Sequence, residues 1–281
     1  MHSKIAVIIP TFNRCTLLAR ALDSVYAQTR LPDEVCVVDD GSTDDTAEFV
    51  QRCYPQVNYV YQPNSGVSAA RNLGARTTSA DWLAFLDSDD EWLPEKLQLQ
   101  MDALMHSPQH RLVHSDEIWM RNNVRVNPGD RYRKYGGDIF LHCLEQCAMA
   151  PSSVVMQRSL FDETGGFDES FPACEDYDLW LKICSRYFVL YLSTPLLVRF
   201  GGHADQLSAR YWGMDRFRVQ ALAKLLNSFA LDDMKYEAAR AVLAAKCQIL
   251  RQGALKRNKQ DMVEEYSNLM QKFPSRQGMT V

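Results

Sequence analysis

Short apolar runs alternate with helical patterns through the first hundred residues of this 281-residue chain. Between the runs, apolar residues recur three and four apart, as in residues 17–25 and 68–77, which is the spacing of one helix face. The runs have the length of buried strands and lie at Ile5–Ile9, Val35–Val38, Val57–Tyr61 and Trp82–Leu86. Strands separated by helices of this length predict right-handed crossovers, and hence an α/β fold with a mainly parallel twisted sheet flanked by helices.

The pattern changes twice after a further helix at residues 94–105. Between about 107 and 151, pairs of Asn and Gly mark turns, which predicts loops and short strands over the ligand-binding end of the sheet. From residue 213 onward the chain is helical, with amphipathic segments near 215–229, 233–252 and 260–273. We therefore predict a domain over residues 1–212 and a helical C-terminal extension over residues 213–281.

Two local features carry further expectations. Ser42 and Asp45 have the spacing of a capping box for the helix that follows them. The eight cysteines include no CxxC pair, and Cys143 and Cys147 fit one buried helix face better than a metal site. Reduced, buried thiols are typical of a cytoplasmic protein.

Composition excludes some classes of function. The formal net charge is −4 and no basic block occurs, so we expect no nucleic-acid partner. The first apolar run is too short for a signal-peptide core, and the longer stretch at residues 187–198 is broken by Ser193-Thr194-Pro195. Neither run is long enough to predict a membrane-spanning helix.

Carboxylates follow two of the predicted strands. Asp87 and Asp89 come directly after the fourth strand and are two residues apart, so both would face one side of a regular strand. Two hard oxygen donors with other positions left open suit Mg²⁺ or Mn²⁺ carrying a substrate's phosphates. The alternative is an acidic turn that ends the strand and caps the next helix.

Other polar residues belong to the same edge of a parallel sheet. Thr11 ends the first strand and Asp40 follows the second, and both can hydrogen-bond a nucleobase or a ribose. Arg71, on the helix after the third strand, can add a charge-assisted contact. Each also has a structural alternative, since Asp40 can belong to a turn and Arg71 to a solvated helix face. Agreement between three strand ends favours a ligand site.

The chain resembles the family 2 glycosyltransferases of bacterial type, which have the GT-A fold. The resemblance covers about residues 4 to 203 and rests on five segments in order: IPTFNR at 9–14, VDDGSTD at 38–44, NSGVSAARN at 64–72, LDSDD at 86–90 and CEDYDLW at 174–180. It implies a half that binds the nucleotide-sugar, about residues 1–106, and an acceptor half, about residues 107–212.

The resemblance also implies roles for individual residues. Asp87 and Asp89 would form the DxD motif, with Asp89 as the direct ligand of Mn²⁺ or Mg²⁺. Asp176 would be the general base, and repulsion between the adjacent carboxylates of Glu175 and Asp176 could raise the pKa of one of them. His203 would add a metal or phosphate contact, although a lone His is often structural. The nucleotide-sugar, most often a UDP-sugar, would be held by Pro10, Thr11, Asn13, Arg14, Asp39, Asp40, Asn64, Arg71, Asp87 and Ser88.

A carboxylate base and a nucleoside diphosphate leaving group fit a single displacement, which inverts the anomeric centre. We therefore expect an inverting glycosyltransferase (a hexosyltransferase type) acting in surface polysaccharide or glycan synthesis. Its acceptor would be a glycan, a lipid-linked molecule or a protein. A catalytically silent nucleotide-sugar-binding protein of the same fold is the alternative. A phosphotransferase is disfavoured because the first strand ends without the required Asp-x-Asp.

Three further properties stay open at this point. The basic amphipathic segment 215–229 can lie on a membrane surface or pack on its own domain. The expected location is therefore the cytoplasm, with the inner face of the cell membrane as an option. A homodimer is also left open.

Overall fold

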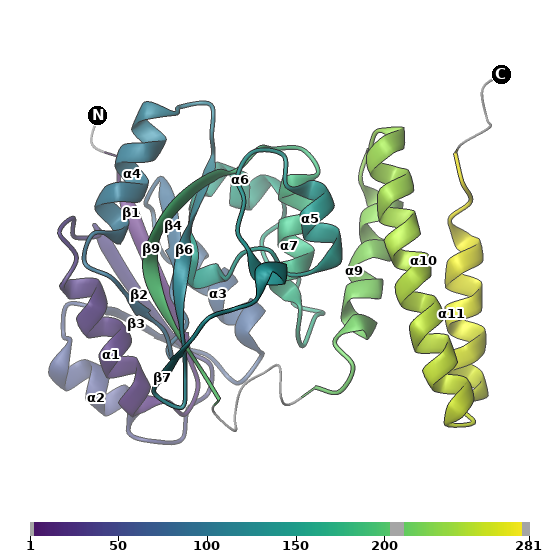
Figure 1. The fold of residues 1–281 in the computed structure, drawn as a ribbon. Helices are drawn as coiled ribbons and strands as arrows, with labels where there is room; N and C mark the ends of the chain where they lie inside the picture. The colour runs from purple at the N-terminus through teal and green to yellow at the C-terminus, as the bar shows by residue number, and fades with distance from the viewer. Residues whose placement is uncertain (1–2, 203–210, 277–281) are drawn as a thin grey trace.

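The computed structural model describes residues 3–202 and 211–276 of the chain, which form a central sheet covered by helices on both faces and a helical unit at one side (Figure 1). The strands of the described residues are β1 (Ile5–Thr11), β2 (Glu34–Asp39), β3 (Asn58–Tyr61), β4 (Trp82–Phe85), β5 (Glu91–Trp92), β6 (Leu112–Arg121), β7 (Val124–Val126), β8 (Val154–Gln157) and β9 (Leu190–Gly201). Their order across the sheet is β3-β2-β1-β4-β8-β6-β9-β5, and β7 pairs with the end of β6.

The first half of the sheet is parallel, as the alternation of strands and helices predicts. β1 pairs in parallel with both β2 and β4, and β2 pairs in parallel with β3. Thr11 lies opposite Asp39 in this register, so the carboxyl ends of β1 and β2 lie together. The second half is mixed, because β8 is antiparallel to β4 and β6, whereas β6 and β9 are parallel to each other.

Side chains of β1 alternate between the two layers of helices, as those of a buried strand must. Ile5, Val7 and Ile9 pack into the apolar cluster of α1 and α4, while Ala6 and Ile8 face the cluster that contains α3, α5, α6 and α7. The helices of this domain are α1 (Cys15–Tyr26), α2 (Thr46–Cys53), α3 (Val67–Arg76), α4 (Lys96–His106), α5 (Phe140–Glu145), α6 (Arg158–Glu163) and α7 (Glu175–Cys184), with 3₁₀ turns at Asp130–Tyr132 and Pro151–Ser153.

Helix α3 lies unusually close to the sheet. A β-carbon on Gly74 would come within 2.5 Å of Ile8 Cγ2, so only glycine lets the helix backbone approach β1 at this point. This close packing places the first turns of α3 beside the carboxyl ends of β1 and β4. It thereby fixes where Arg71 can reach.

Three helices form the C-terminal unit beside α7: α9 (Asp215–Ser228), α10 (Asp233–Lys256) and α11 (Gln260–Lys272) (Figure 1). Phe217, Leu222 and Leu225 of α9 are buried in the same apolar cluster as Tyr177 and Trp180 of α7. The apolar face of segment 215–229 thus packs on the protein itself. Because the unit shares this core with the sheet domain, the boundary near residue 213 marks a change of structure and stays a prediction as a domain boundary.

Two local expectations are wrong. Ser42 does not cap α2: its hydroxyl accepts a hydrogen bond from the Asn13 amide, and Asp44 accepts from Thr46 instead. Cys147 lies two residues beyond the end of α5 and so is not on one helix face with Cys143. A contact with a residue distant in sequence replaces the expected capping box in the first case and the expected helix face in the second. Over the described residues, no helix is long and apolar enough to cross a membrane.

Candidate functional site

The carboxyl end of β1 carries a polar group without a partner. The Thr11 side chain is 3% exposed, and its hydroxyl has no hydrogen-bond partner within the described part of the chain. A buried hydroxyl left unpaired costs free energy, so a ligand that pairs with it gains affinity. Thr11 is therefore placed as a ligand-binding residue must be.

The neighbouring carboxylate of Asp39 is held by two donors. The Ser42 amide donates to Asp39 Oδ1 at 2.7 Å, and the Tyr59 hydroxyl donates to Asp39 Oδ2 at 2.5 Å. Burial, together with this contact to Asp39, raises the pKa of Tyr59, so the phenol stays protonated and keeps donating. Asp39 is thus fixed in orientation at the end of β2.

Asp40 organises the loop that leads into α3. Its Oδ1 accepts hydrogen bonds from Gln62 Nε2 and the Ser65 amide, and its Oδ2 accepts from the Gly66 amide. Asn64 Nδ2 donates to the Asp40 backbone carbonyl at 2.8 Å. Asp40 and Asn64 therefore have a structural role in this loop, and their contact with a nucleotide stays a prediction.

Asn13 and Arg14 connect the end of β1 to two other segments. Asn13 has a left-handed backbone (φ 52°), and its Oδ1 accepts a hydrogen bond from the Thr43 amide at 2.7 Å. Arg14 Nη1 lies 3.0 Å from Asp89 Oδ2, and both side chains are largely buried. The Arg14 guanidinium thus balances the charge of Asp89.

Arg71 is the central cation of the site. Its side chain is 3% exposed and bridges two carboxylates, with Nη2 at 2.6 Å from Asp87 Oδ1 and Nη1 at 2.7 Å from Glu175 Oε1. Its guanidinium also lies over the Phe167 ring, 4.9 Å from the centroid. Arg71, which the sequence predicts as a nucleotide contact, thus joins the DxD segment to the start of α7.

The DxD segment is a turn after β4. The Asp90 amide donates to the Asp87 carbonyl at 3.0 Å, and Ser152 supports both residues: its hydroxyl accepts from the Asp87 amide and donates to Asp90 Oδ2. Asp90 is buried, and burial together with Asp89 and Asp87 raises its pKa well above the ordinary value. Asp90 thus ties the turn to Ser152 from beneath.

The start of α7 supplies a second pair of carboxylates. Cys174 precedes the helix in a left-handed conformation (φ 65°), which turns Glu175 and Asp176 toward the DxD segment. Burial and the adjacent Asp176 raise the pKa of Glu175, while Arg71 lowers it. The Cys147 thiol donates to Asp176 Oδ2 at 2.9 Å, and burial and this carboxylate raise the pKa of Cys147. No pattern in the sequence links Cys147 to Asp176, so this contact was not predicted.

One pocket of about 280 Å³ brings the two carboxylate pairs together. Its lining includes the predicted residues Pro10, Arg14, Arg71, Asp87, Ser88, Asp89, Glu175 and Asp176. It is also lined by residues that were not predicted from the sequence, among them Arg199 and Phe200 of β9 and Met214 and Arg218 at the start of α9. The pocket lining does not include the predicted residues Thr11, Asn13, Asp39, Asp40 and Asn64, and His203 lies outside the described residues.

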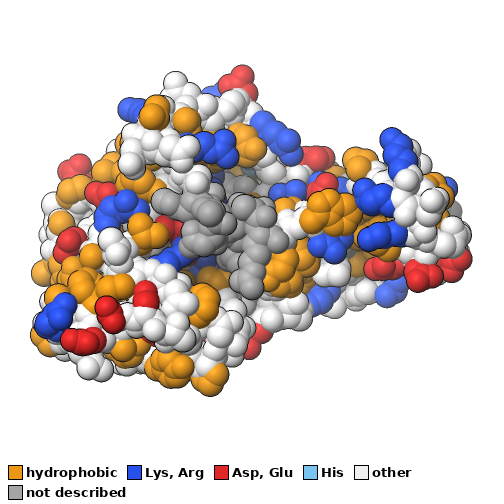
Figure 2. Space-filling view, turned by 90° about the horizontal axis from the view of Figure 1, so that it is seen from below, with side chains coloured by type: hydrophobic (Ala, Val, Ile, Leu, Met, Phe, Trp, Pro, Cys, Tyr) orange, Lys and Arg blue, Asp and Glu red, His pale blue; other side chains and the backbone are white. Residues whose placement is uncertain are grey.

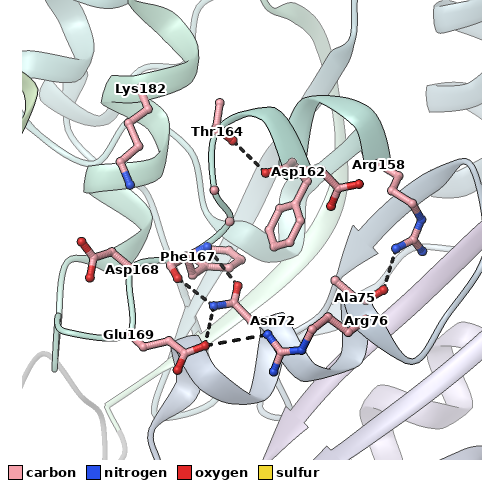
Figure 3. A pocket seen from close by; sticks show the side chains of 13 residues that line it. Asn72, Ala75, Arg76, Arg158, Asp162, Thr164, Phe167, Asp168, Glu169 and Lys182 are labelled. Atoms are coloured by element: carbon pink, nitrogen blue, oxygen red, sulfur yellow. Dashed lines mark hydrogen bonds and ion pairs between the residues drawn. The ribbon is translucent and has the colours of Figure 1, made fainter. Parts of the chain in front are cut away.

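A larger and shallower cavity of about 600 Å³ lies between α3 and α6 (Figure 3). Several of its polar groups are already paired: Asn72 Nδ2 donates to the Phe167 carbonyl and to Glu169, and Arg158 donates to the Ala75 carbonyl. It contains none of the predicted site residues. We therefore assign the chemistry to the smaller pocket, where carboxylates and arginines converge.

The side chains that could bind a metal ion in the smaller pocket determine which metal it suits. In residues 3–202 and 211–276, no group of three or more His, Cys, Asp or Glu side chains could hold a metal ion alone. Asp87 and Asp89 offer two carboxylates, which is the share that a protein gives to Mg²⁺ or Mn²⁺ when a substrate's phosphates supply other ligands. The residues present thus fit a metal that arrives with a diphosphate.

Comparison with known proteins identifies the family of the chain. The family model described as Glycosyl transferase family 2 matches residues 6–158, and the chain belongs to this family. An uncharacterized glycosyltransferase of Rickettsia felis is 31% identical over 188 residues, which cover 66% of this chain and 31% of that protein. Another, from Rickettsia prowazekii, is 30% identical over 212 residues, which cover 72% of this chain and 65% of that protein.

A named relative is the chondroitin synthase of Escherichia coli, 28% identical over 183 residues, which cover 64% of this chain and 26% of that enzyme. The chain thus spans less than two thirds of the length of each of these relatives. Among solved structures, TarS residues 1–349 of S. aureus in complex with UDP-GlcNAc superposes with a TM-score of 0.71 at 20% identity, covering 96% of this chain and 82% of TarS. This similarity confirms the α/β fold of the GT-A type with its helical C-terminal region.

Proposed function

We propose that this protein is an inverting glycosyltransferase that moves a sugar from a nucleotide-diphospho-sugar, a UDP-sugar above all, to an acceptor hydroxyl. The observation that carries the proposal is the pocket in which Asp87 and Asp89 face Glu175 and Asp176, with Arg71 between the pairs. The structural neighbour TarS was solved with UDP and with UDP-GlcNAc, which supports a uridine donor.

The donor would bind at the carboxyl ends of β1 and β2. Thr11 offers the unpaired hydroxyl there, and Asp39 is oriented by Ser42 and Tyr59. Asp89, with Asp87, would hold Mn²⁺ or Mg²⁺ against the diphosphate. When bound, this ion neutralises the negative charge that develops on the leaving diphosphate. Arg14 and Arg71, which pair with these carboxylates, add further positive charge at the same place.

Asp176 is the better of the two adjacent carboxylates for the general base. Glu175 is committed to Arg71 at 2.7 Å, and its role is to position that guanidinium. Among the described residues, Asp176 accepts only from the Tyr177 amide and the Cys147 thiol, so its carboxylate keeps lone pairs for an acceptor hydroxyl. It lies on a segment separate from the DxD turn, as a base that attacks from the opposite sugar face requires. A single displacement with one base yields a β-linked product from an α-linked donor.

The relative from Escherichia coli is named a chondroitin synthase, which supports a role in polysaccharide synthesis. The acceptor would be a glycan, a lipid-linked molecule or a protein.

A donor-release assay tests the proposal. With a panel of UDP-sugars and Mn²⁺, wild type should release UDP, and Asp176→Asn should lower turnover by about 10²- to 10⁴-fold, the contribution of a general base. Asp162→Asn, an exposed carboxylate at the larger cavity, is the matched control and should keep full activity. UDP affinity should be equal in all three proteins.

Two results would contradict this reading. Tight UDP binding without turnover of any donor would favour the silent nucleotide-sugar-binding protein. An α-linked product, seen by NMR of the anomeric proton, would exclude inversion.

A further inference from the structure

Charge is unevenly divided along the chain. Residues 211–276 hold twelve Lys and Arg against seven Asp and Glu, whereas the rest of the chain holds 19 against 28. The helical unit therefore has a net charge of +5 and the remainder −9. Such an asymmetry favours an anionic partner for the helical unit alone.

Part of this positive charge gathers in what we call the Trp212 patch, formed by Trp212, Arg216, Leu255, Lys256, Arg257 and Lys259. Trp212 is 54% exposed and Leu255 is 47% exposed. Lys256, Arg257 and Lys259 are exposed at the turn between α10 and α11, and none of them pairs with a carboxylate of the described residues. Figure 2 shows Lys and Arg side chains gathered on the helical unit in the view from below.

Contacts hold the patch together. Two guanidiniums lie over the Trp212 ring, that of Arg216 at 5.1 Å and that of Arg257 at 4.6 Å from the centroid. Arg216 also donates two hydrogen bonds to the Trp212 carbonyl. The start of α9 and the end of α10 are thereby joined into one surface. An aromatic ring with cations around it has an apolar body and a charged rim.

The patch adjoins the mouth of the candidate active site. Met214 and Arg218 line the pocket, and Trp212 and Arg216 stand two residues before them in the segment that leads into α9 and in its first turn. Arg218 is turned to the pocket side by Asp215, which accepts its Nη1 at 2.9 Å. A flat partner seated on the patch would therefore lie beside the opening of the pocket.

We propose that the Trp212 patch docks on an anionic lipid membrane and presents the pocket to an acceptor at that surface. Trp and Leu beside unpaired Lys and Arg are the composition of a membrane-interface site, where aromatic rings enter the headgroup region and cations meet lipid phosphates. A polysaccharide chain fits less well, because sugar rings stack on open aromatic faces and guanidiniums cover the ring of Trp212. The acidic sheet domain is repelled by the same surface, so only one orientation is favoured.

Vesicle sedimentation tests the proposal without requiring transfer activity, so its failure is distinct from failure of the proposed function. The full chain should bind phosphatidylglycerol–phosphatidylcholine vesicles and should not bind pure phosphatidylcholine vesicles. Added salt should release the protein from the anionic vesicles. Neutralising the turn as Lys256→Gln, Arg257→Gln and Lys259→Gln should weaken binding on the order of a hundredfold, from about one kcal/mol per cation.

The control removes three exposed cations elsewhere, as Arg52→Gln, Arg76→Gln and Lys272→Gln, and should bind like wild type. Circular dichroism would show that both triple variants fold. Equal binding of the two variants, equal binding to neutral vesicles, or retention on heparin without any vesicle binding would each overturn the proposal.

Discussion

The bridge made by Arg71 should dominate the stability of the site. Arg71→Met removes a guanidinium that is 3% exposed and leaves Glu175, whose side chain is 8% exposed, without its partner at 2.7 Å. Breaking a buried pair by removing one partner costs about 3–5 kcal/mol, because an uncompensated charge stays buried. We expect a loss of that size from the free energy of unfolding at pH 7.5, measured by urea denaturation.

The loss should also depend on pH. Burial and Asp176 already raise the pKa of Glu175, and without Arg71 it should rise further. A folded-state pKa above the unfolded value means that the folded protein binds the proton more tightly, so stability falls as pH rises through that window. Arg71→Met should therefore cost less at pH 5 than at pH 7.5.

A double variant makes this reasoning testable. Glu175→Gln in the Arg71→Met background removes the stranded charge and should restore about 1–3 kcal/mol, a coupling typical of residues in contact. The matched control is Arg76→Met on the same helix, which is paired with Glu169 only at 4.0 Å and is well exposed. A cost below about 1 kcal/mol for Arg71→Met, or simple additivity with Glu175→Gln, would refute a buried ionic bridge.

Three further predictions concern the core. Burial lowers the pKa of His114 to about 4, so the free energy of unfolding of wild type should fall by about 3 kcal/mol between pH 6.5 and pH 4. In urea denaturation at a series of pH values, His114→Gln should reduce this fall, and an unchanged pH dependence would contradict the prediction. Burial also lowers the pKa of Lys96, so Lys96→Met should stabilise the protein at pH 7 and the gain should shrink toward pH 10, whereas a loss at pH 7 would count against the idea. Gly74→Ala should cost about 1–3 kcal/mol by forcing α3 off Ile8, and a thermal midpoint equal to wild type would show that the helix can move.

The parallel half of the sheet could be predicted because its strands are uninterrupted apolar runs. Strands buried on both faces read this way, and the helices between them keep a regular apolar spacing. The carboxyl ends of such strands meet at one edge, so the positions of Thr11, Asp39, Asp87 and Asp89 follow from topology. In the parallel half of the sheet, the local sequence pattern therefore predicts the observed fold.

The second half could not be read in this way. Strand β6 carries His114 and Glu117 inside the sheet, and their partners are the Tyr135 carbonyl and Lys134, which no local pattern reveals. Strand β9 continues through Pro195, where the sequence indicates a break, because a register shift opposite Asp116 accommodates the missing amide. Contacts between residues distant in sequence therefore determine the structure of this half of the sheet.

In the candidate site, too, some features follow from local sequence and others depend on tertiary contacts. Sequence motifs located both carboxylate pairs, but not their connection, because Arg71 and Glu175 are 104 residues apart. The contact of Cys147 with Asp176 and the contribution of α9 to the pocket are likewise tertiary. Residue types predict the chemistry, and packing decides which groups are free to perform it.

The most direct test of the central claim is calorimetry of UDP, GDP and dTDP binding, with and without Mn²⁺, on wild type, Asp89→Ala and the exposed control Asp261→Ala. We predict that one nucleotide, UDP, binds only with Mn²⁺ to wild type and Asp261→Ala, and that Asp89→Ala loses this binding. If none of the three nucleotides binds in the presence of the metal, the pocket of Asp87 and Asp89 is not a nucleotide-sugar site.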